Sequence, residues 1–281
     1  MSTLLVGFDS AWTATNSGAL VGVLRNIDGT YKELGLPQVV NYGQAADTIL
    51  GWQDQQKPAA SIVLLDQPTI VGNAKGQRPV ENIVASPVSR RYGGVQPANT
   101  ARAEMFGTDA PIWRFLEQFG GAADPHEPVT DTGVIETYPV LAIIALGWTL
   151  PHSTRSTGRL PKYNPARRKT FLISDWQYLC QRTSSELEAL GLPELAQSVA
   201  GLARAGAPRK ADQDCLDACI CLLVALYLAE PRECLMVGNM DTGYIVVPSG
   251  NLLRDELHAR CDNTGRAHSE WVRPFVLRSV G

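Results

Sequence analysis

The chain has 281 residues, of which 44% are hydrophobic, and its 25 basic residues are nearly balanced by 28 acidic ones. This length suffices for one large domain or two small ones, and the balanced charge argues against a general nucleic-acid coat protein. The sequence holds no apolar run of the roughly 18 residues that a membrane span needs, and it begins with neither a basic nor a long apolar segment, so we expect neither a membrane protein nor a signal peptide.

The first part of the chain predicts a meander of strands and then a helix. Residues 3–8 and 19–25 are apolar runs separated by a turn at 16–18, and residues 30–34 form a third expected strand. A helix is expected over 43–56. Hairpin-linked strands followed by a helix indicate that the chain next crosses over the sheet that they form.

Two later segments share the form of a buried parallel strand. SIVLLDQP (61–68) is an apolar run closed by an acid and a proline, and TGVIETYP (132–139) repeats that pattern. Between them, a loop rich in Gly and Pro runs from 69 to about 110. Loops of that length are usually functional or mobile.

The second half of the chain predicts mainly helices. A late strand is expected at 243–248, and helices are expected at about 139–147, 166–182, 184–190, 193–204 and 212–229. A strand meander followed by crossover helices predicts an α/β protein whose mixed sheet carries helices on its faces.

Acids recur at the ends of the predicted strands. Asp9, Asp66 and Glu136 each follow an apolar run, and ligands of α/β sheets bind outside the carboxyl ends of the strands. Asp214 and Asp217 are three residues apart at the start of the most apolar helix, so they share one face of it. We expect a helix this apolar to be buried, with its acids held near the sheet.

Each acid taken alone has a simpler explanation. Asp9 and Asp66 suit turns, Glu136 suits pairing with an arginine, and Asp212 and Asp214 suit the start of a helix. Gathered at one place, however, the carboxylates repel one another, and a divalent cation relieves that repulsion. Mg²⁺ and Mn²⁺ prefer carboxylate oxygens, and two such ions about 4 Å apart activate water for phosphodiester cleavage.

The sequence at this point resembles the ribonuclease H-like superfamily, and in particular a bacterial family of unknown function identified as predicted RNase H-like nucleases. The motifs that carry the resemblance span most of the chain, and their order and spacing are more specific than any one of them. They are GFDSAW (7–12), VLLDQP (63–68), VIETYP (134–139), LPKYNP (160–165) and DQDCLDA (212–218).

The resemblance implies a fold and a set of site residues. The implied fold is a five-stranded mixed sheet ordered 3-2-1-4-5 with helices on both faces, in a single domain over 1–281. We expect a long insertion at about 69–130 and a C-terminal extension from about 231, with the strand at 243–248 as an added edge strand. The metal-binding roles of the superfamily fall on Asp9, Asp66 and the Asp214/Asp217 pair, and Glu136 is expected as an auxiliary ligand.

Basic residues follow the strand-end acids and suit a phosphate backbone. No Asp or Glu occurs from residue 137 to 174, and the loop after Asp66 is also mainly basic. Tyr92, Trp148 and Tyr163 interleave with these charges and are candidates to stack on bases; ordinary solvated loops are the alternative. Lys169 and Lys162 are equal candidates for a catalytic lysine at phosphate. The expected substrate-binding residues are Arg90, Arg91, Arg155, Arg159, Lys162, Tyr163, Arg167 and Arg168.

Three functions remain open at the level of sequence. The first is a metal-dependent nuclease, a hydrolase with Mg²⁺ or Mn²⁺ bound, in which Asp9, Asp66, Asp217 and Lys169 are catalytic. The second is an actin-like or sugar-kinase-type ATPase, although Ala11 stands where that class has glycine. The third is a non-catalytic binding or scaffold protein with a vestigial site.

Cysteine usage and charge bear on location and partners. Six cysteines occur, and those at 215 and 219 lie four residues apart among apolar residues, which favours core positions over a soft-metal site. Reduced thiols indicate a cytoplasmic protein. The expected partner is nucleic acid, either DNA or RNA, with no membrane; a homodimer remains open.

Overall fold

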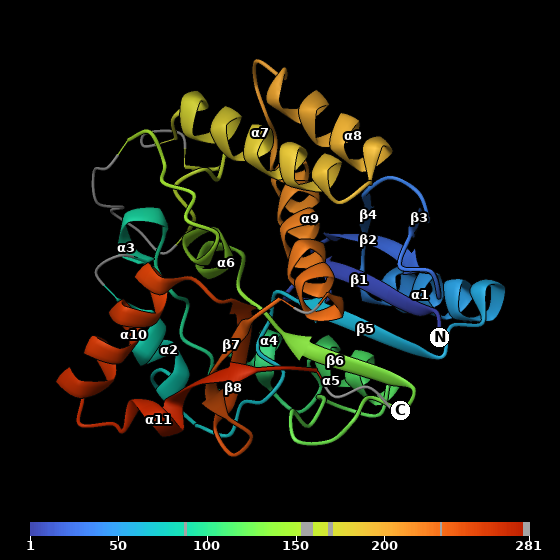
Figure 1. Ribbon diagram of the computed structural model, residues 1–281. Coiled ribbons are helices and arrows are strands. Elements are labelled where there is room, and N and C mark those ends of the chain that lie inside the picture. Colours follow the sequence, from blue (N-terminus) through green and yellow to red (C-terminus); the bar gives the residue numbers. More distant parts are fainter. Residues whose placement is uncertain (87–88, 153–159, 168–170, 231, 278–281) are drawn as a thin grey trace.

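The computed structural model describes residues 1–86, 89–152, 160–167, 171–230 and 232–277, which form two β-sheets with helices around them (Figure 1). The larger sheet has the strand order β3-β2-β1-β5-β6, and β4 also pairs with β2. Its strands are β1 (Thr3–Asp9), β2 (Gly18–Arg25), β3 (Tyr31–Glu33), β4 (Gln38–Val40), β5 (Ala60–Leu65) and β6 (Thr132–Glu136).

The sheet is mixed, as the sequence predicts, but the expected count of five strands is one too few. β1 is antiparallel to β2 and parallel to β5, which is in turn parallel to β6. The sixth strand arises because two short strands share one edge of β2: β3 pairs with residues 23–25 and β4 with residues 18–20. Gly35, at φ 122°, and the following Pro37 separate them.

Helix α9 (Lys210–Ala229) covers one face of the sheet and lies across β1 and β2. Gly7 permits this contact, because a Cβ atom there would lie 2.1 Å from the carbonyl oxygen of Ala218 and 2.4 Å from the amide nitrogen of Leu222. The helix backbone therefore rests directly on the first strand.

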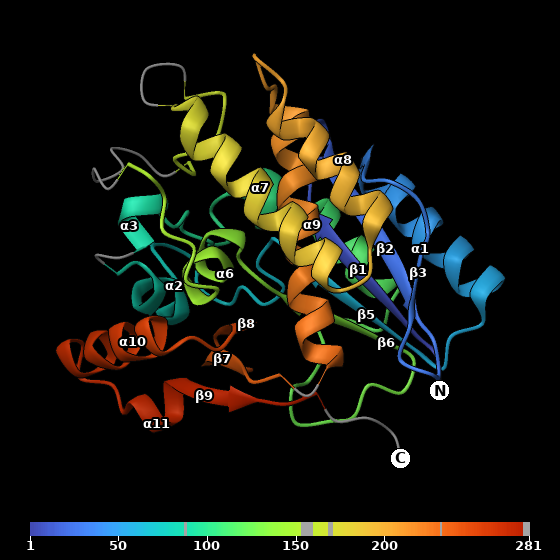
Figure 2. The same cartoon turned by 45° about the horizontal axis from the view of Figure 1, so that its top comes forward.

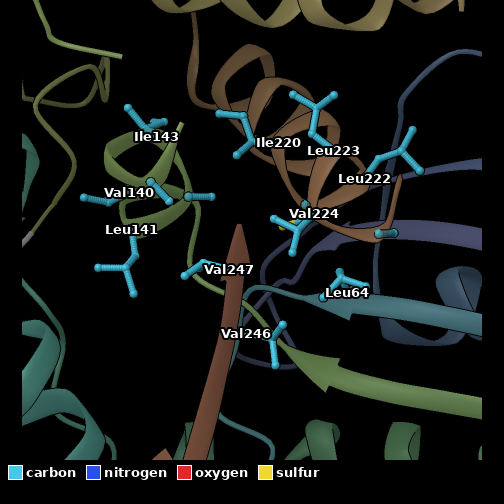
Figure 3. Close-up of a cluster of buried hydrophobic side chains, with 14 of the residues drawn as sticks. Leu64, Val140, Leu141, Ile143, Ile220, Leu222, Leu223, Val224, Val246 and Val247 are labelled. Carbon is cyan, nitrogen blue, oxygen red and sulfur yellow. The ribbon is translucent and has the colours of Figure 1, made fainter. Parts of the chain in front are cut away.

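Further helices build outward from α9. α7 (Ile173–Ala189) and α8 (Pro193–Ala203) lie side by side beyond it (Figure 2), and α6 (Pro139–Ala145) follows β6 directly. Figure 3 shows α9, α6, β5 and β8 contributing aliphatic side chains to a single core. The labelled residues are Leu64, Val140, Leu141, Ile143, Ile220, Leu222, Leu223, Val224, Val246 and Val247.

The opposite face of the sheet is covered by α1 (Tyr42–Gln56) and α5 (Pro111–Glu117). Phe8 packs against Tyr42 and Phe115 there, with ring centroids 5.8 and 5.3 Å away. Helix α1 begins as predicted, because Asn41 caps it and exchanges hydrogen bonds with Gln44. Helices thus flank both faces of the sheet.

The strand at 243–248 does not extend the main sheet, which corrects the expectation of an added edge strand. It is β8 (Gly243–Pro248), and it belongs to a second sheet of order β8-β7-β9 with β7 (Cys234–Asn239) and β9 (Val272–Phe275). Thr137 donates a 2.8 Å hydrogen bond to the carbonyl of Val246, which fastens this sheet to the end of β6. The helices α10 (Asn251–Asn263) and α11 (His268–Trp271) complete the C-terminal part.

Two other expectations differ from the structure. The segment after β5 holds short helices as well as loops: α2 (Pro79–Val84), α3 (Ser89–Tyr92) and α4 (Ala103–Phe106). The helices expected at 166–182 and 184–190 are one helix, α7, which begins at Ile173, and Ser184 within it donates a hydrogen bond to the carbonyl of Ala196 on α8. Over the described residues, the six cysteines are free, and no helix is long and apolar enough to cross a membrane.

Candidate functional site

Asp9 and Asp66 lie side by side at the carboxyl ends of two parallel strands. Phe8 is the register partner of Leu65, and the amide of Asp66 donates a 2.9 Å hydrogen bond to the carbonyl of Phe8. Side chains alternate along a strand, and Phe8 and Leu65 belong to the core under α1 and α5. The two acids that follow them therefore face the other side of the sheet, where α9 lies.

Helix α9 brings two further acids to this place. Asp214 and Asp217 lie in its first turns and are 4% and 2% exposed, as the sequence predicts for acids at the start of a buried helix. Asp214 is held by an ion pair with Lys210, and Asp217 accepts hydrogen bonds from Gln213 and, at 2.8 Å, from the hydroxyl of Tyr163. Asp212 accepts from the amide of Arg209 and caps the helix, so it takes the structural role.

All four carboxylates line one cavity of about 570 Å³. Its walls come from the β1–β2 turn, the ends of β5 and β6, the first turns of α9, and loops near 94–96 and 160–164. Trp12, Met105 and Ile245 supply apolar surface, so the cavity is polar at the strand ends and apolar around them.

The carboxylates share one electrostatic environment. Burial raises the pKa of Asp9 well above its ordinary value; Lys210 opposes this, while Asp217, Asp66 and Asp214 raise it further. Burial and then the charge of Asp217 raise the pKa of Asp66 in the same way. Burial also raises the pKa of Asp217 to about 7, against the lowering effects of Lys210, Tyr163 and Gln213. The pKa values of these aspartates therefore depend on the charges of neighbouring aspartates and of Lys210.

The donor set suits a hard divalent cation in its chemistry. Carboxylate oxygens are the ligands of Mg²⁺ and Mn²⁺, and the buried Oδ2 atom of Asp9 has no hydrogen-bond partner. As the side chains stand, no group of three or more His, Cys, Asp or Glu residues in the described part of the chain is disposed to hold a metal ion. Coordination by Asp214 or Asp217 would compete with the hydrogen bonds that these carboxylates already accept.

Glu136 is engaged by an arginine, which is the simpler of the two interpretations of this residue. Both of its oxygens accept from Arg78, at 2.8 and 2.6 Å, and one also accepts from the amide of Thr69. Arg78 is 1% exposed and pairs with Glu81 as well, at 2.8 Å. Glu136 lines the cavity, but it is already paired with Arg78, a cation that it shares with Glu81.

Lys162 and Tyr163, which the sequence predicts to contact substrate, are buried and bonded to other groups of the protein. Lys162 is 3% exposed; its ammonium donates to the carbonyl of His152 and lies 3.7 Å from the carboxylate of Asp175. Tyr163 is fully buried against Asp217. The rings of Tyr92 and Trp148 are also buried, so these aromatic side chains have no free face for a base.

The remaining basic candidates are only partly placed. Arg91 is exposed in α3, and Arg167 is half-buried and donates a 3.0 Å hydrogen bond to the carbonyl of Leu160. Neither lines the cavity. For Arg90 the structure describes the backbone but not the side chain. The remaining candidates lie outside the described residues: Arg155, Arg159, Arg168 and Lys169.

Sequence reasoning missed the polar residues that surround the acids. Lys210 precedes Asp214 by one helical turn, and that spacing could have identified it. Gln67 accepts from Ser10 at 2.5 Å and from Tyr42, which no sequence pattern indicates. Trp12 lines the cavity with a φ of 60°, a backbone conformation that costs free energy in a bulky residue and recurs at functional sites.

Comparison with known proteins gives one finding that covers most of this site. The search of curated proteins gives no match. Residues 7–240 match the model of a family described as a protein of unknown function, DUF429. That span begins in β1 and ends after β7, so it contains every acid of the cavity and most of the chain. The chain therefore belongs to the DUF429 family.

Proposed function

We propose that this protein is a divalent-metal-dependent phosphodiesterase that cleaves nucleic acid. One observation carries the proposal: Asp9, Asp66 and Asp217 come from two adjacent parallel strands and the helix packed on them, and they line one cavity, where the charge of Asp217 raises the pKa of both Asp9 and Asp66. A cation between such carboxylates offsets their repulsion. When bound, Mg²⁺ or Mn²⁺ supplies a Lewis acid that polarises phosphate and activates water.

The fold supports the same proposal. The strand order β3-β2-β1-β5-β6, in which an antiparallel meander of β1, β2 and β3 is followed by the parallel strands β5 and β6, supports the ribonuclease H-like order that the sequence motifs imply. We therefore propose that the main sheet and α9 form a ribonuclease H-like core, with the second sheet as an addition.

Four side chains have defined tasks under this proposal. Asp9 and Asp66 hold the cation, since Asp9 has an oxygen without a partner and both stand on adjacent strands. Asp217 completes the carboxylate set and is oriented by Gln213 and Tyr163. Lys210, paired with Asp214, places a positive charge beside the reacting phosphate.

The test is hydrolysis of a panel of labelled DNA and RNA, single-stranded and duplex, with Mn²⁺ or Mg²⁺. We expect cleavage of at least one substrate, abolished by EDTA and reduced at least about a hundredfold by Asp9→Asn, because removal of a central charge stabiliser typically has that effect. Asp54→Asn, at an exposed position outside the cavity, is the matched control and should retain activity.

Metal binding has a separate readout. Mn²⁺ should raise the melting temperature of the wild type and of Asp54→Asn, but not that of Asp9→Asn, because a ligand that binds only the folded state stabilises it. Inertness on every substrate, together with a melting temperature that Mn²⁺ leaves unchanged, would favour the scaffold interpretation.

A further inference from the structure

The cavity is the size of one small ligand. Its volume of about 570 Å³ falls within the roughly 300–1,000 Å³ typical of sites that enclose a single small molecule. A polynucleotide that passes through a site needs instead an extended groove that follows several nucleotides, about 4–16 of them in single-strand binding folds. Size alone therefore favours one nucleotide unit.

Charge restricts the ligand further. Among the described residues, six carboxylates line the cavity against two cations, Arg78 and Lys210. Arg78 is already paired with both Glu81 and Glu136. Within the described part of the chain, Lys210 forms an ion pair with Asp214 alone, so of the two cations it is the one that can also contact a phosphate. A bound divalent ion would offset the acids around one phosphate, but each further phosphate would face uncompensated carboxylates. The charges that line the cavity therefore suit a single phosphodiester group and repel several consecutive phosphates of a polynucleotide.

Two buried side-chain amides at the same place each have one atom without a hydrogen-bond partner. Gln67 is 1% exposed and Gln213 is 3% exposed; both line the cavity, and Nε2 of Gln67 and Oε1 of Gln213 have no hydrogen-bond partner. A buried polar atom without a partner is costly, and a ligand that supplies one removes that cost. One free donor and one free acceptor suit a nucleobase edge or a sugar hydroxyl group, which offer both. Trp12 and Ile245 provide the apolar wall on which a base packs.

We infer that the cavity receives one nucleotide at the end of a nucleic-acid strand, with Gln67 and Gln213 binding its polar edge. The inference rests on the proposed function and makes the enzyme an exonuclease. The scissile phosphate lies at the four aspartates, and water adds to phosphorus as the ester oxygen of the chain leaves with a proton, which releases one mononucleotide and a strand shortened by one unit.

The first test compares a linear single-stranded oligonucleotide with the same sequence ligated into a circle, in Mn²⁺, as DNA and as RNA. We expect stepwise release of mononucleotides from the linear strand and no cleavage of the circle. Cleavage of the circle at a similar rate overturns the inference and leaves the proposed function standing. Hydrolysis of a dinucleotide alone, with the longer strand untouched, shows that the occupant is a free small diester and overturns it too.

A binding measurement distinguishes the outcomes that remain if no oligonucleotide is cleaved. If neither strand is cut, a nucleoside 5′-monophosphate with Mn²⁺ is titrated calorimetrically into the full chain. Saturable binding that is lost in Asp9→Asn supports a nucleotide-sized site while it overturns the hydrolytic function. An absence of binding overturns both.

The second test addresses Gln67. Gln67→Met removes the amide without adding charge, and we expect KM for the linear strand to rise about tenfold, with a smaller change in kcat, because one hydrogen bond to the ligand is lost. Gln53→Met is the matched control, since Gln53 bridges Ser61 and Thr132 and does not line the cavity. An equal effect of both variants on KM, or no effect of Gln67→Met, contradicts the assigned role.

Discussion

At the scale of single residues, the site depends on buried charges that are only partly compensated. Arg78 pairs with two buried glutamates, Glu81 and Glu136, so one positive charge is shared between two negative ones. The four aspartates have still less compensation, since the charge of Lys210 is what lowers the pKa of both Asp9 and Asp66. Burying ionised groups without full pairing costs stability. This loss of stability arises at the cavity that we propose as the active site.

The raised pKa of Asp217 predicts how stability depends on pH. The group titrates near its ordinary value when unfolded and at about 7 when folded, so the folded state holds more protons between those values. The free energy of unfolding should therefore fall as pH rises from about 4 to 7, without added metal. Each unit of pKa shift corresponds to about 1.4 kcal/mol, so we expect a fall of at least about 1 kcal/mol.

Asp217→Asn should flatten that dependence. The variant removes the charge, and the free Oε1 of Gln213 can accept from the new amide, so we expect greater stability than the wild type at pH 8 in urea denaturation. Asp54→Asn, which is exposed, should keep the wild-type slope from pH 5 to 8. An unchanged slope in Asp217→Asn contradicts the prediction.

At the scale of elements, the contact between β1 and α9 aligns the acids of the strands with those of the helix. Gly7→Ala would place a methyl group against the backbone of Ala218, which cannot move aside as a flexible side chain can. We expect a loss of about 2 kcal/mol in the free energy of unfolding, measured in urea, because overpacking a tight contact has costs of that order. Activity should fall as well, since α9 must shift with its two aspartates.

The matched control for that substitution is Gly51→Ala. Gly51 lies within helix α1, and a Cβ atom there meets nothing within 4 Å. Alanine at such a helical position is expected to stabilise by about 0.5–1 kcal/mol. If Gly7→Ala behaves like Gly51→Ala, the close approach of α9 does not constrain the strand.

Elements with strong patterns could be predicted from the sequence. The apolar runs of β1, β5 and β6 and the continuously apolar α9 were found because burial on both sides leaves a clear signal. Helix α10 is not predicted, since its buried residues are only Leu253, Leu257 and Cys261 and most of the others are polar. The short β4 was missed for a related reason: two of its three residues are exposed.

Part of the candidate site was predictable for the same reason. Strand ends in a parallel pair share one edge, so Asp9 and Asp66 could be placed together from sequence. The burial of Lys162 and Tyr163 could not, because it depends on how the segment at 160–164 packs against α7 and α9. Hydrogen bonds between distant side chains leave no local pattern.

At the scale of the whole molecule, the second sheet is an integral part of the core. Val246 and Val247 pack with residues of α6, α9 and β5 (Figure 3), and Tyr244 donates a 2.5 Å hydrogen bond to the carbonyl of Ala123. Ile245 reaches the cavity itself. The C-terminal part therefore supports both the core and the site.

A truncated chain tests that conclusion. A chain that ends at Glu230 would expose the apolar surface that β8 covers, so we expect it to aggregate or to lose cooperative thermal unfolding, measured by circular dichroism and light scattering. A chain that ends at Leu277, which keeps all the described residues, is the control and should unfold like the wild type. A cooperative transition at the wild-type temperature in the shorter chain contradicts the prediction.

The separation of the site residues along the chain also has a consequence for biosynthesis. Asp9 and Asp66 are made early, whereas Asp214 and Asp217 follow more than a hundred residues later in α9. Domains fold as units while the ribosome extends the chain from its N-terminus. The face of the early strands that α9 covers therefore stays open until α9 emerges, and a nascent chain that ends before α9 has only two of the four aspartates. Under the proposed function, the enzyme stays inactive beside the RNA of the ribosome until its synthesis is nearly complete.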